Sequence, residues 1–448
     1  TLKKEWLQKN PNTFLVIAGD FVSPSVYNSL QYHGKAVRGR QMVESLNAAG
    51  MDFAVFGNHE FDIKENELQE RINESAFQWI STNAFHRQNG KVMPFEKDGA
   101  PFPKTYVLKL SDADGTTAKI GIITATLPFN RADYVSYTDA LISAKEAYNN
   151  LKDSVDAVIA LTHQTVAEDK KLAAELPGLA VVLGGHEHDM RFERVGDVYI
   201  TKAHANAKSA YAVNLHINKR KKKTETKPQL VYINESIALD SATNVVVKKW
   251  TDIAERNYSS LGFEARKTVL NNGTPLDGRE AEVRSHPTNL TRLVIFAMQE
   301  AAPQADVVLM NSGSIRVDDV LPMPITEYDI IRTLPFGGGI READMKGSLL
   351  IRTLEQGLKN RGIGGYLQYN ESIINEDGTW KLKGSAIEPD KIYRVAMSDF
   401  LFTGKEANLD FLNPSNADVV KVYEPVTSIA DSRSDIRLAV VRYLEKRL

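Results

Sequence analysis

FAVFGNHEFD, residues 53–62, joins a short apolar run to a turn of polar residues. Three other runs in the first half of the chain share this pattern, because each ends at a ligand-type side chain. They are Phe14–Ala18 before Gly19-Asp20, Val158–Leu161 before Thr162-His163, and Leu179–Leu183 before Gly184-Gly185-His186. Unbroken apolar runs of this length are typical of strands buried on both faces. The first half is therefore predicted to contain a buried sheet.

Helical patterns lie between these runs. Met42, Val43, Leu46 and Ala49 fall at helical spacing, and Gly50 follows as a helix stop. Buried strands that alternate with amphipathic helices predict an α/β core of packed layers. Ligands in such cores bind at one end of the strands, which is where the polar residues fall.

The composition of the chain excludes several classes of protein. A length of 448 residues predicts about two to four domains at roughly 100–200 residues each. With 55 Lys and Arg against 57 Asp and Glu, the chain lacks the basic footprint of a nucleic-acid-binding protein. No apolar run is long enough for a membrane span. The absence of cysteine excludes disulfides, thiolate metal sites and a cysteine nucleophile.

The middle of the chain has the pattern of a domain connection. Asn218–Pro228 reads NKRKKKTETKP, which is typical of a solvated loop or hairpin tip. The next segment has apolar residues on one helical face, namely Trp250, Ile253, Ala254 and Tyr258. We expect three parts: an N-terminal domain over 1–225, a linker with a connecting helix over 226–268, and a C-terminal domain over 269–448.

The polar residues at the strand ends predict a metal site. The candidate ligands are Asp20, Asn58, His163, His186 and His188. Carboxylate oxygen, amide oxygen and neutral imidazole are the donors that zinc, manganese and cobalt accept. Asp20 is the only carboxylate among them, and a carboxylate can bridge two ions. The alternative is that these side chains only cap turns.

A second function lies within the same turn. His59 follows the candidate ligand Asn58, and Asp62 is close enough along a tight turn to orient the imidazole. Such a carboxylate fixes the imidazole tautomer and favours its charged form. We therefore expect a catalytic His59–Asp62 pair, with a merely capped histidine as the alternative.

These motifs resemble known families. Gly19-Asp20, GNHEFD from Gly57 to Asp62, Leu161-Thr162-His163 and GGHEHD from Gly184 to Asp189 resemble the calcineurin-like metallophosphoesterase signature in order and spacing. In the second half, NSGSIR from Asn311 to Arg316 resembles the Asn-x-Gly-x-x-Arg substrate motif of 5'-nucleotidases. Leu334–Gly338 and Asp399–Gly404 resemble the two aromatic base-stacking segments of that family.

The resemblance implies a fold and a metal centre. The fold would be a four-layer αββα metallophosphoesterase domain, joined by a linker helix to a smaller α/β substrate-binding domain. Two divalent ions (zinc, manganese or cobalt) would be bridged by Asp20. Asn58, His163 and His186 would hold one ion and His188 the other, while His59 and Asp62 would be the catalytic pair.

The resemblance also implies a substrate site in the C-terminal domain. Asn311, Gly313 and Arg316 would hold the nucleotide, and Arg284 would join them. Phe336 and Phe400 would stack on the base. Glu406 stands in a loop where the family has Gly-Gly-Asp, and here the chain reads Gly404-Lys405-Glu406. This difference leaves the base preference open.

The expected activity is release of phosphate from nucleoside 5'-monophosphates by a hydroxide that bridges two metals. Two alternatives are a nucleotide phosphodiesterase or pyrophosphatase and a catalytically silent nucleotide-binding protein. The family also implies a periplasmic or extracellular location. It begins with a strand ending in Asp-x-His, which has no counterpart before Asp20. We expect a first strand to precede the sequence shown. The alternative is that one of the two metal sites lacks these two ligands.

Overall fold

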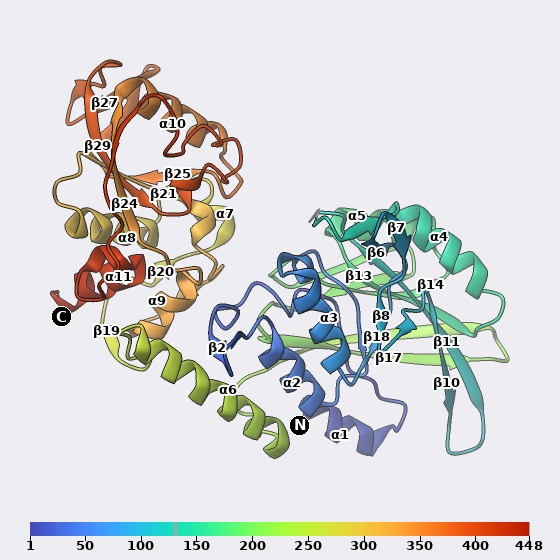
Figure 1. The fold of residues 1–448 in the computed structure, drawn as a ribbon. Helices are drawn as coiled ribbons and strands as arrows, with labels where there is room; N and C mark the ends of the chain where they lie inside the picture. Colours follow the sequence, from blue (N-terminus) through green and yellow to red (C-terminus); the bar gives the residue numbers. More distant parts are fainter. Residues whose placement is uncertain (130–131, 448) are drawn as a thin grey trace. The chain divides into compact units, whose positions relative to one another are not determined.

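The computed structural model describes residues 1–129 and 132–447 (Figure 1). The chain forms two compact units, Thr1–Asp252 and Ile253–Leu448. The division falls inside helix α6 (Ser241–Ser260), which lies within the predicted linker 226–268. The exact domain limits stay a prediction. Below, unit 1 and unit 2 are described separately.

Two principal sheets form the frame of unit 1. The larger has the order β10-β11-β13-β14-β16-β15, and the smaller has the order β1-β4-β5. The larger comprises β10 (Tyr106–Ser111), β11 (Thr117–Thr126), β13 (Ala157–His163), β14 (Leu179–Gly184), β15 (Arg191–Val195) and β16 (Val198–Lys202). The smaller comprises β1 (Val16–Ile17), β4 (Phe53–Ala54) and β5 (Gln78–Trp79). All four apolar runs predicted as strands therefore contain strands.

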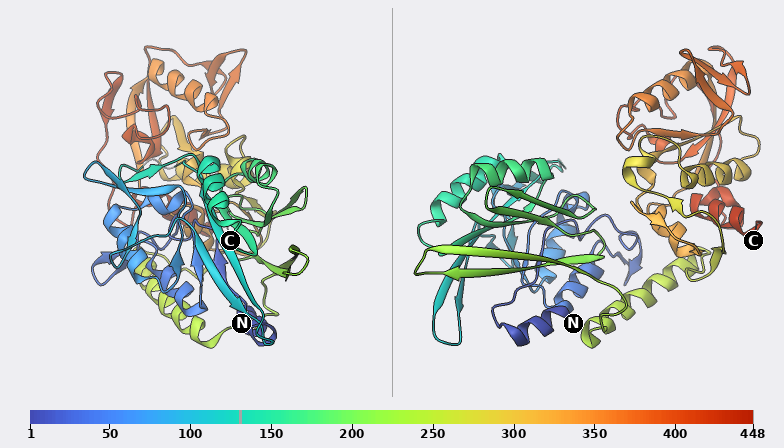
Figure 2. Two further views of the ribbon diagram at one scale, coloured as in Figure 1. Left: turned by 90° about the vertical axis from the view of Figure 1, so that its right-hand side faces the viewer. Right: turned by 180° about the vertical axis from the view of Figure 1, so that it is seen from behind.

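The helices of unit 1 cover these sheets. They are α1 (Leu2–Lys9), α2 (Arg40–Ala49), α3 (Glu65–Glu74), α4 (Ala140–Leu151) and α5 (Val166–Glu175). Helix α2 matches the helix predicted from the spacing of its apolar residues, and it ends at Gly50 with a φ of 73°. Helices α4 and α5 contact each other and lie side by side (Figures 1 and 2).

Three apolar clusters show how the layers of unit 1 stack. One joins residues of α2 and α3 to the smaller sheet, and another joins α4 and α5 to the larger sheet. A third, which includes Phe53, Ile80 and Leu161, joins the two sheets face to face. Along β13, Val158 packs toward the helices and Ile159 toward the other sheet, so both faces of the strand are buried. The order is helix, sheet, sheet, helix, which confirms the predicted four-layer fold.

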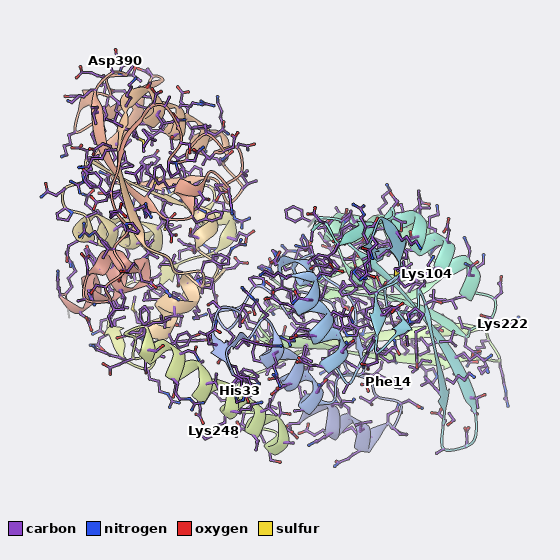
Figure 3. All side chains as sticks on the ribbon, viewed as in Figure 1. Phe14, His33, Lys104, Lys222, Lys248 and Asp390 are labelled. Atoms are coloured by element: carbon purple, nitrogen blue, oxygen red, sulfur yellow. The ribbon has the colours of Figure 1, made fainter. Side chains whose placement is uncertain are left out.

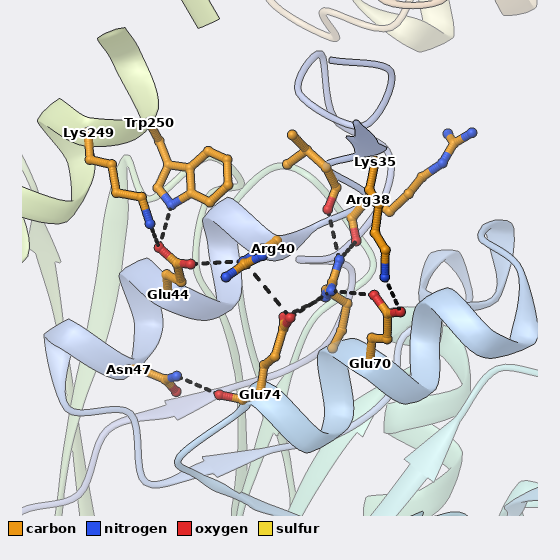
Figure 4. Close-up of polar contacts among 11 residues, drawn as sticks. Lys35, Arg38, Arg40, Glu44, Asn47, Glu70, Glu74, Lys249 and Trp250 are labelled. Carbon is orange, nitrogen blue, oxygen red and sulfur yellow. Dashed lines mark hydrogen bonds and ion pairs between the residues drawn. The ribbon is translucent and has the colours of Figure 1, made fainter. Parts of the chain in front are cut away.

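The first part of α6 is anchored to unit 1. Glu44 on α2 accepts hydrogen bonds from Lys249 Nζ (2.6 Å) and from the indole N–H of Trp250 (2.9 Å), as Figure 4 shows. The Tyr32 ring lies 5.1 Å from the Trp250 ring. Trp250 is buried, as the apolar helical face predicted.

The basic segment is the tip of a long hairpin. Strands β17 (Ser209–Asn218) and β18 (Lys223–Tyr232) pair antiparallel over their full lengths. Lys222, labelled in Figure 3, lies in the exposed turn between them. The solvated hairpin tip predicted from the charge run is confirmed. Short pairings complete unit 1: β2 (Gln31–Tyr32) with β3 (Lys35–Ala36), β12 (Val135–Tyr137) with β6 (Ala84–Gln88) and β7 (Lys91–Met93), and β8 (Glu96–Lys97) with β9 (Ala100–Pro101).

Unit 2 has a central mixed sheet with helices on both faces (Figure 1). Its order is β25 (Leu367–Tyr369), β21 (Val307–Asn311), β29 (Ile392–Ser398), β24 (Ile340–Lys346) and β30 (Val419–Val422). Helix α10 (Gly347–Lys359) packs on the face that contains Val307 and Leu309. Helix α8 (Asn289–Ala301) contacts β21 and β25 and is capped by Thr288.

The remaining helices and short strands of unit 2 complete the fold. The helices are α7 (Glu280–Val283), α9 (Glu327–Thr333) and α11 (Ile436–Glu445). The strands are β19 (Thr268–Leu270), β20 (Leu276–Asp277), β22 (Val320–Leu321), β23 (Ile325–Thr326), β26 (Ile373–Glu376), β27 (Thr379–Leu382) and β28 (Ser385–Ala386). In the described part of both units, no helix has the length and apolar character needed to span a bilayer.

Candidate metal centre and substrate-binding cluster

Four strand ends place the candidate ligands of unit 1. Asp20 follows β1, Asn58 follows β4, His163 ends β13, and His186 follows β14. Strands β1 and β4 are parallel, and so are β13 and β14. The carboxyl ends of parallel strands meet at one edge of a sheet, which brings their side chains together.

The donor atoms of these residues converge. The ligand atoms of Asp20, His163 and His186 lie within 4.8 Å of one another. His163 Nε2 is 2.9 Å from Asp20 Oδ2 and 3.1 Å from Asn58 Oδ1. His163 and Asn58 are both buried. The predicted ligands on these four strands therefore form one cluster.

The chemistry of this cluster fits a divalent cation. The Nδ1 atom of His163 donates to the Ala18 carbonyl at 2.6 Å, so the neutral ring has its lone pair on Nε2. That lone pair faces the oxygens of Asp20 and Asn58, and three electron-pair donors in one place are the environment of a metal ion. The set holds one carboxylate, one amide and two imidazoles, which suits zinc, manganese or cobalt.

The ionisation of these groups is strongly interdependent. Burial would raise the pKa of Asp20, but the hydrogen bond to His163 and the charges of His163 and His59 hold that pKa below its usual value. Burial would lower the pKa of His163, but Asp20 and the Ala18 carbonyl raise it. Burial and the neighbouring His163 lower the pKa of His186. Asp20 is thus kept ionised and His186 neutral, which are the forms that bind metals, whereas His163 would release its Nε2 proton when an ion binds.

The turn after β4 holds the predicted catalytic pair. A 3-10 helix covers His59–Asp62, and it places His59 Nδ1 2.7 Å from Asp62 Oδ2. The backbone N–H of His59 also donates to Asp20 Oδ1 at 2.8 Å. Asp62 accepts a hydrogen bond from His59 Nδ1–H, so Nε2 is the ring atom that can exchange a proton. The pair is thereby tied to the metal cluster.

His188 occupies a different environment from the other candidate ligands. It is exposed, and its carbonyl accepts from the backbone N–H of Ala205 at 2.7 Å. The metal-capable group found among the described residues contains Asp20, His163 and His186 but not His188. The role of His188 at a second ion stays a prediction.

Unit 2 brings its two predicted aromatic residues to one end of its sheet. Ile340 pairs with Ser398 at the ends of β24 and β29, and Phe336 and Phe400 lie just beyond that pair. Gly339 N–H donates to Asp399 Oδ2 at 3.2 Å, which joins the two loops. Phe336 is 63% exposed and Phe400 45%, so neither ring is part of the core.

The predicted polar residues of unit 2 lie on adjoining loops. Asn311 ends β21 and is buried, and its Nδ2 donates to Glu406 Oε2 at 2.6 Å. Ser314 Oγ donates to Asn311 Oδ1 at 2.8 Å. The Arg316 guanidinium lies 5.5 Å from the centre of the Phe336 ring. The structure thus joins Asn311 with Glu406 and Arg316 with Phe336.

The other two predicted substrate residues flank this cluster through the main chain. Gly313 N–H donates to the Gly364 carbonyl at 2.8 Å, and the Arg284 carbonyl accepts from Gly362 N–H at 2.8 Å. One glycine loop therefore contacts both segments. The Arg284 side chain pairs with Glu280 at 2.6 Å.

Comparisons with known proteins agree with this division. Residues 2–190 match the calcineurin-like phosphoesterase family, and residues 267–412 match the 5'-nucleotidase C-terminal domain. The chain thus has both domains that the predicted 5'-nucleotidase family combines. The protein UshA of Yersinia enterocolitica is 26% identical over 419 residues, covering 79% of this chain and 72% of that protein. The bovine 5'-nucleotidase is 23% identical over 448 residues, covering 88% of this chain and 75% of that protein.

A solved structure supports the two-domain fold of this chain. The crystal structure of a 5'-nucleotidase precursor from Thermus thermophilus matches with a TM-score of 0.71 and 21% identity, covering 100% of this chain and 89% of that one. The predicted family, the two-domain α/β fold and the class of metal-dependent phosphoester hydrolase are confirmed.

Sequence reasoning missed Glu60, which shapes the metal centre of this chain. The buried Glu60 carboxylate accepts four backbone N–H bonds, from Asp20 (2.8 Å), Phe21 (2.8 Å), Val22 (3.1 Å) and Gly57 (2.6 Å). Burial and the Asp20 charge raise the pKa of Glu60, while these N–H donors oppose the rise. Glu60 thus joins the loop of Asp20 to the loop of Asn58. Its place inside GNHEFD was the available signal.

The close approach of these two loops requires a glycine. A Cβ atom added at Gly57 would lie 2.2 Å from Asp20 Oδ1 and 2.6 Å from the Asp20 backbone nitrogen. Asp20 itself has a φ of 55° and His186 a φ of 84°, both in the left-handed region that non-glycine residues rarely adopt. Such backbone strain at two candidate ligands is typical of functional sites.

Proposed function

We propose that this chain is a two-metal phosphohydrolase that releases phosphate from nucleoside 5'-monophosphates. The observation that carries the proposal is that ligand atoms of Asp20, His163 and His186 lie within 4.8 Å of one another, with Asn58 Oδ1 3.1 Å from His163 Nε2 and the His59–Asp62 pair on the adjoining turn. Asn58, His163 and His186 would hold one ion, His188 would hold the other, and Asp20 would bridge them. The donor set is compatible with zinc, manganese or cobalt.

When bound, two divalent ions supply positive charge to meet the phosphate dianion and lower the pKa of a water molecule. The chain preserves that charge, because Asp20 contributes one negative charge and the other four proposed ligands are neutral. A site built from several carboxylates would cancel more of it. The donor set is therefore suited to an anionic substrate.

His59 supplies the proton chemistry of the proposed reaction. Asp62 Oδ2 lies 2.7 Å from His59 Nδ1 and accepts a hydrogen bond from it, which stabilises the charged imidazolium. The Nε2 atom can then donate a proton to the leaving ribose oxygen or stabilise the phosphoryl oxygens. A positioned acid of this kind contributes about 10²–10⁴-fold to a rate.

The cluster in unit 2 supports a nucleotide as the substrate. Phe336 and Phe400 expose their rings, and stacking of a base on an aromatic ring contributes about 1–3 kcal/mol. Arg316 beside Phe336 offers a cation to the substrate, and Asn311 and Glu406 offer hydrogen-bonding groups. The bovine relative is named a 5'-nucleotidase, which agrees with this assignment. A periplasmic or extracellular location stays a prediction.

A substrate panel tests the proposal. Release of inorganic phosphate from AMP and p-nitrophenyl phosphate would be compared, with 2',3'-cyclic AMP assayed for 2'-AMP and 3'-AMP, and UDP-glucose for UMP and glucose 1-phosphate, as well as for phosphate. The proposal predicts the highest kcat/KM for AMP. Faster cleavage of UDP-glucose or cyclic AMP would instead indicate a pyrophosphatase or phosphodiesterase. AMP binding without turnover of any substrate would indicate a silent nucleotide-binding protein.

A further inference from the structure

A buried lysine lies directly behind the metal centre. Lys202 is the last residue of β16, and it pairs with Gly184 on the neighbouring strand β14. Its side chain is 0% exposed. A lysine is almost never fully buried unless it is paired, so its contacts indicate its role.

Lys202 contacts the main chain beside two candidate ligands. Its Nζ donates to the Gln164 carbonyl at 2.5 Å and to the Gly185 carbonyl at 2.9 Å. Gln164 follows His163 directly, and Gly185 precedes His186. One ammonium group therefore joins the two segments that carry these imidazoles.

Two carboxylates complete the surroundings of Lys202. Its Nζ lies 2.8 Å from Asp169 Oδ2 and 2.5 Å from Glu187 Oε2. Asp169 also accepts from Gln164 Nε2 at 3.0 Å, and Glu187 accepts from the backbone N–H of Val166 at 2.6 Å. Both carboxylates are thus fixed to the start of α5 or to the segment that precedes it.

The neighbouring strand β14 packs closely against Lys202 at Gly184. A Cβ atom at Gly184 would lie 2.9 Å from Lys202 Cε and 3.1 Å from Asp169 Oδ2. Any larger residue at position 184 would displace the lysine or the strand. The network therefore occupies a defined place in the fold and cannot shift without moving the segment before His186.

We infer that Lys202 is a positioning residue of the metal centre, which holds the segments of His163 and His186 in the geometry that binds an ion. This inference rests on the metal centre of the proposed function. Groups that orient metal ligands in this way typically change metal affinity by about 10–100-fold when they are lost.

A purely stabilising role explains this network less well. Replacement of a buried ion pair by well-packed apolar residues is often neutral or stabilising, because removing the charges from water is costly. A buried lysine paired with two carboxylates is thus expected to add little to the free energy of unfolding. Its two bonds to main-chain carbonyls beside His163 and His186 point to their placement.

The test is the affinity of the full chain for Zn²⁺ and for Mn²⁺, measured by titration calorimetry on metal-free protein. K202M removes the ammonium and keeps most of the side-chain length. Because K202M leaves the Asp169 and Glu187 carboxylates without their cationic partner, a second variant, K202M/D169N/E187Q, removes all three ionisable groups. Near-ultraviolet circular dichroism and the Tm report whether each variant is folded.

R71M is the matched control. Arg71 is also buried, donates to the carbonyls of Val37 (2.9 Å) and Arg38 (3.3 Å), and pairs with Glu74. It lies in unit 1, and none of these partners is a candidate ligand. We expect affinity to fall about 10–100-fold in both Lys202 variants and to stay within about twofold in R71M.

Each outcome decides one of the two claims. Folded Lys202 variants that bind metal as tightly as wild type would overturn the positioning role and leave the proposed function intact. Loss of the fold in both variants would also overturn it, because the network would then serve stability. Wild-type protein that binds neither ion would contradict the metal centre itself.

Discussion

The metal cluster of unit 1 and the substrate cluster of unit 2 differ in how they are held. His163 is 1% exposed and Asn58 2%, whereas Phe336 is 63% exposed and Phe400 45%. The first cluster stands on strand ends supported by Glu60 and by the backbone, while the two aromatic rings of the second stand on loops. A metal centre needs fixed donors, and a base-stacking surface must stay open to its ligand. Substitutions in the two clusters should therefore have different effects.

Loss of a ligand in the buried cluster should have the largest effect. H163N removes the imidazole on which the other donors converge. Loss of a hydrogen-bonding partner of a metal ligand lowers metal affinity about 10–100-fold. Because H163N removes a ligand itself, we expect the affinity for a divalent ion to fall by more than that, and turnover to fall with it. Titration with Zn²⁺ and AMP turnover measure both. H86N is the control, since His86 is buried in the same unit but pairs with Glu65. Equal loss in both variants would contradict the assignment.

Loss of the catalytic histidine should separate chemistry from metal binding. H59N removes the proton donor while leaving the converging donors in place. We expect bound metal near the wild-type level and turnover of AMP lowered about 10²–10⁴-fold. Metal analysis and steady-state kinetics on the same preparation check this. A variant that loses metal but keeps its turnover would show that His59 has a different role.

Loss of a stacking ring should affect one class of substrate only. F336A removes an exposed ring, so we expect the KM for AMP to rise about 5- to 150-fold, since stacking contributes about 1–3 kcal/mol. The kinetics of p-nitrophenyl phosphate, which has no base, should hardly change. F192A removes an exposed ring of unit 1 and should leave both substrates unaffected. Equal damage to both substrates by F336A would remove Phe336 from the base site.

The smallest effect is expected at the contact between Asn311 and Glu406. E406A removes the acceptor that holds Asn311 Nδ2 at 2.6 Å. A net hydrogen-bond contribution of about 0.5–1.5 kcal/mol predicts a KM for AMP raised about 2- to 10-fold, with little change in Tm. K405A, at the exposed neighbouring position, is the control. An unchanged KM in E406A would show that this contact does not support nucleotide binding.

The sequence was most informative where the signal is local. Apolar runs that end at Asp20, Asn58, His163 and His186 predicted both the buried strands and the cluster at their ends. The His59–Asp62 contact was predictable too, because it spans three residues within one turn. These features depend on spacing along the chain, which a sequence displays directly.

Features that depend on strand register were not predictable. Lys202 reaches the carbonyls of Gln164 and Gly185 only because β16 pairs with β14 in one particular register. The contact between Asn311 and Glu406 joins residues 95 positions apart. Main-chain acceptors leave no residue-type pattern, so nothing in the sequence marked Lys202 as different from other lysines.

The most direct measurement of the central claim is phosphate release from AMP by metal-free protein. The full chain would be chelated exhaustively, checked for residual metal, and then titrated with Zn²⁺, Mn²⁺ or Co²⁺ while phosphate release is recorded. Activity should disappear on chelation and return as ions bind, saturating at two equivalents per chain. Hydrolysis of AMP that is undiminished in protein shown to be free of metal would contradict the claim.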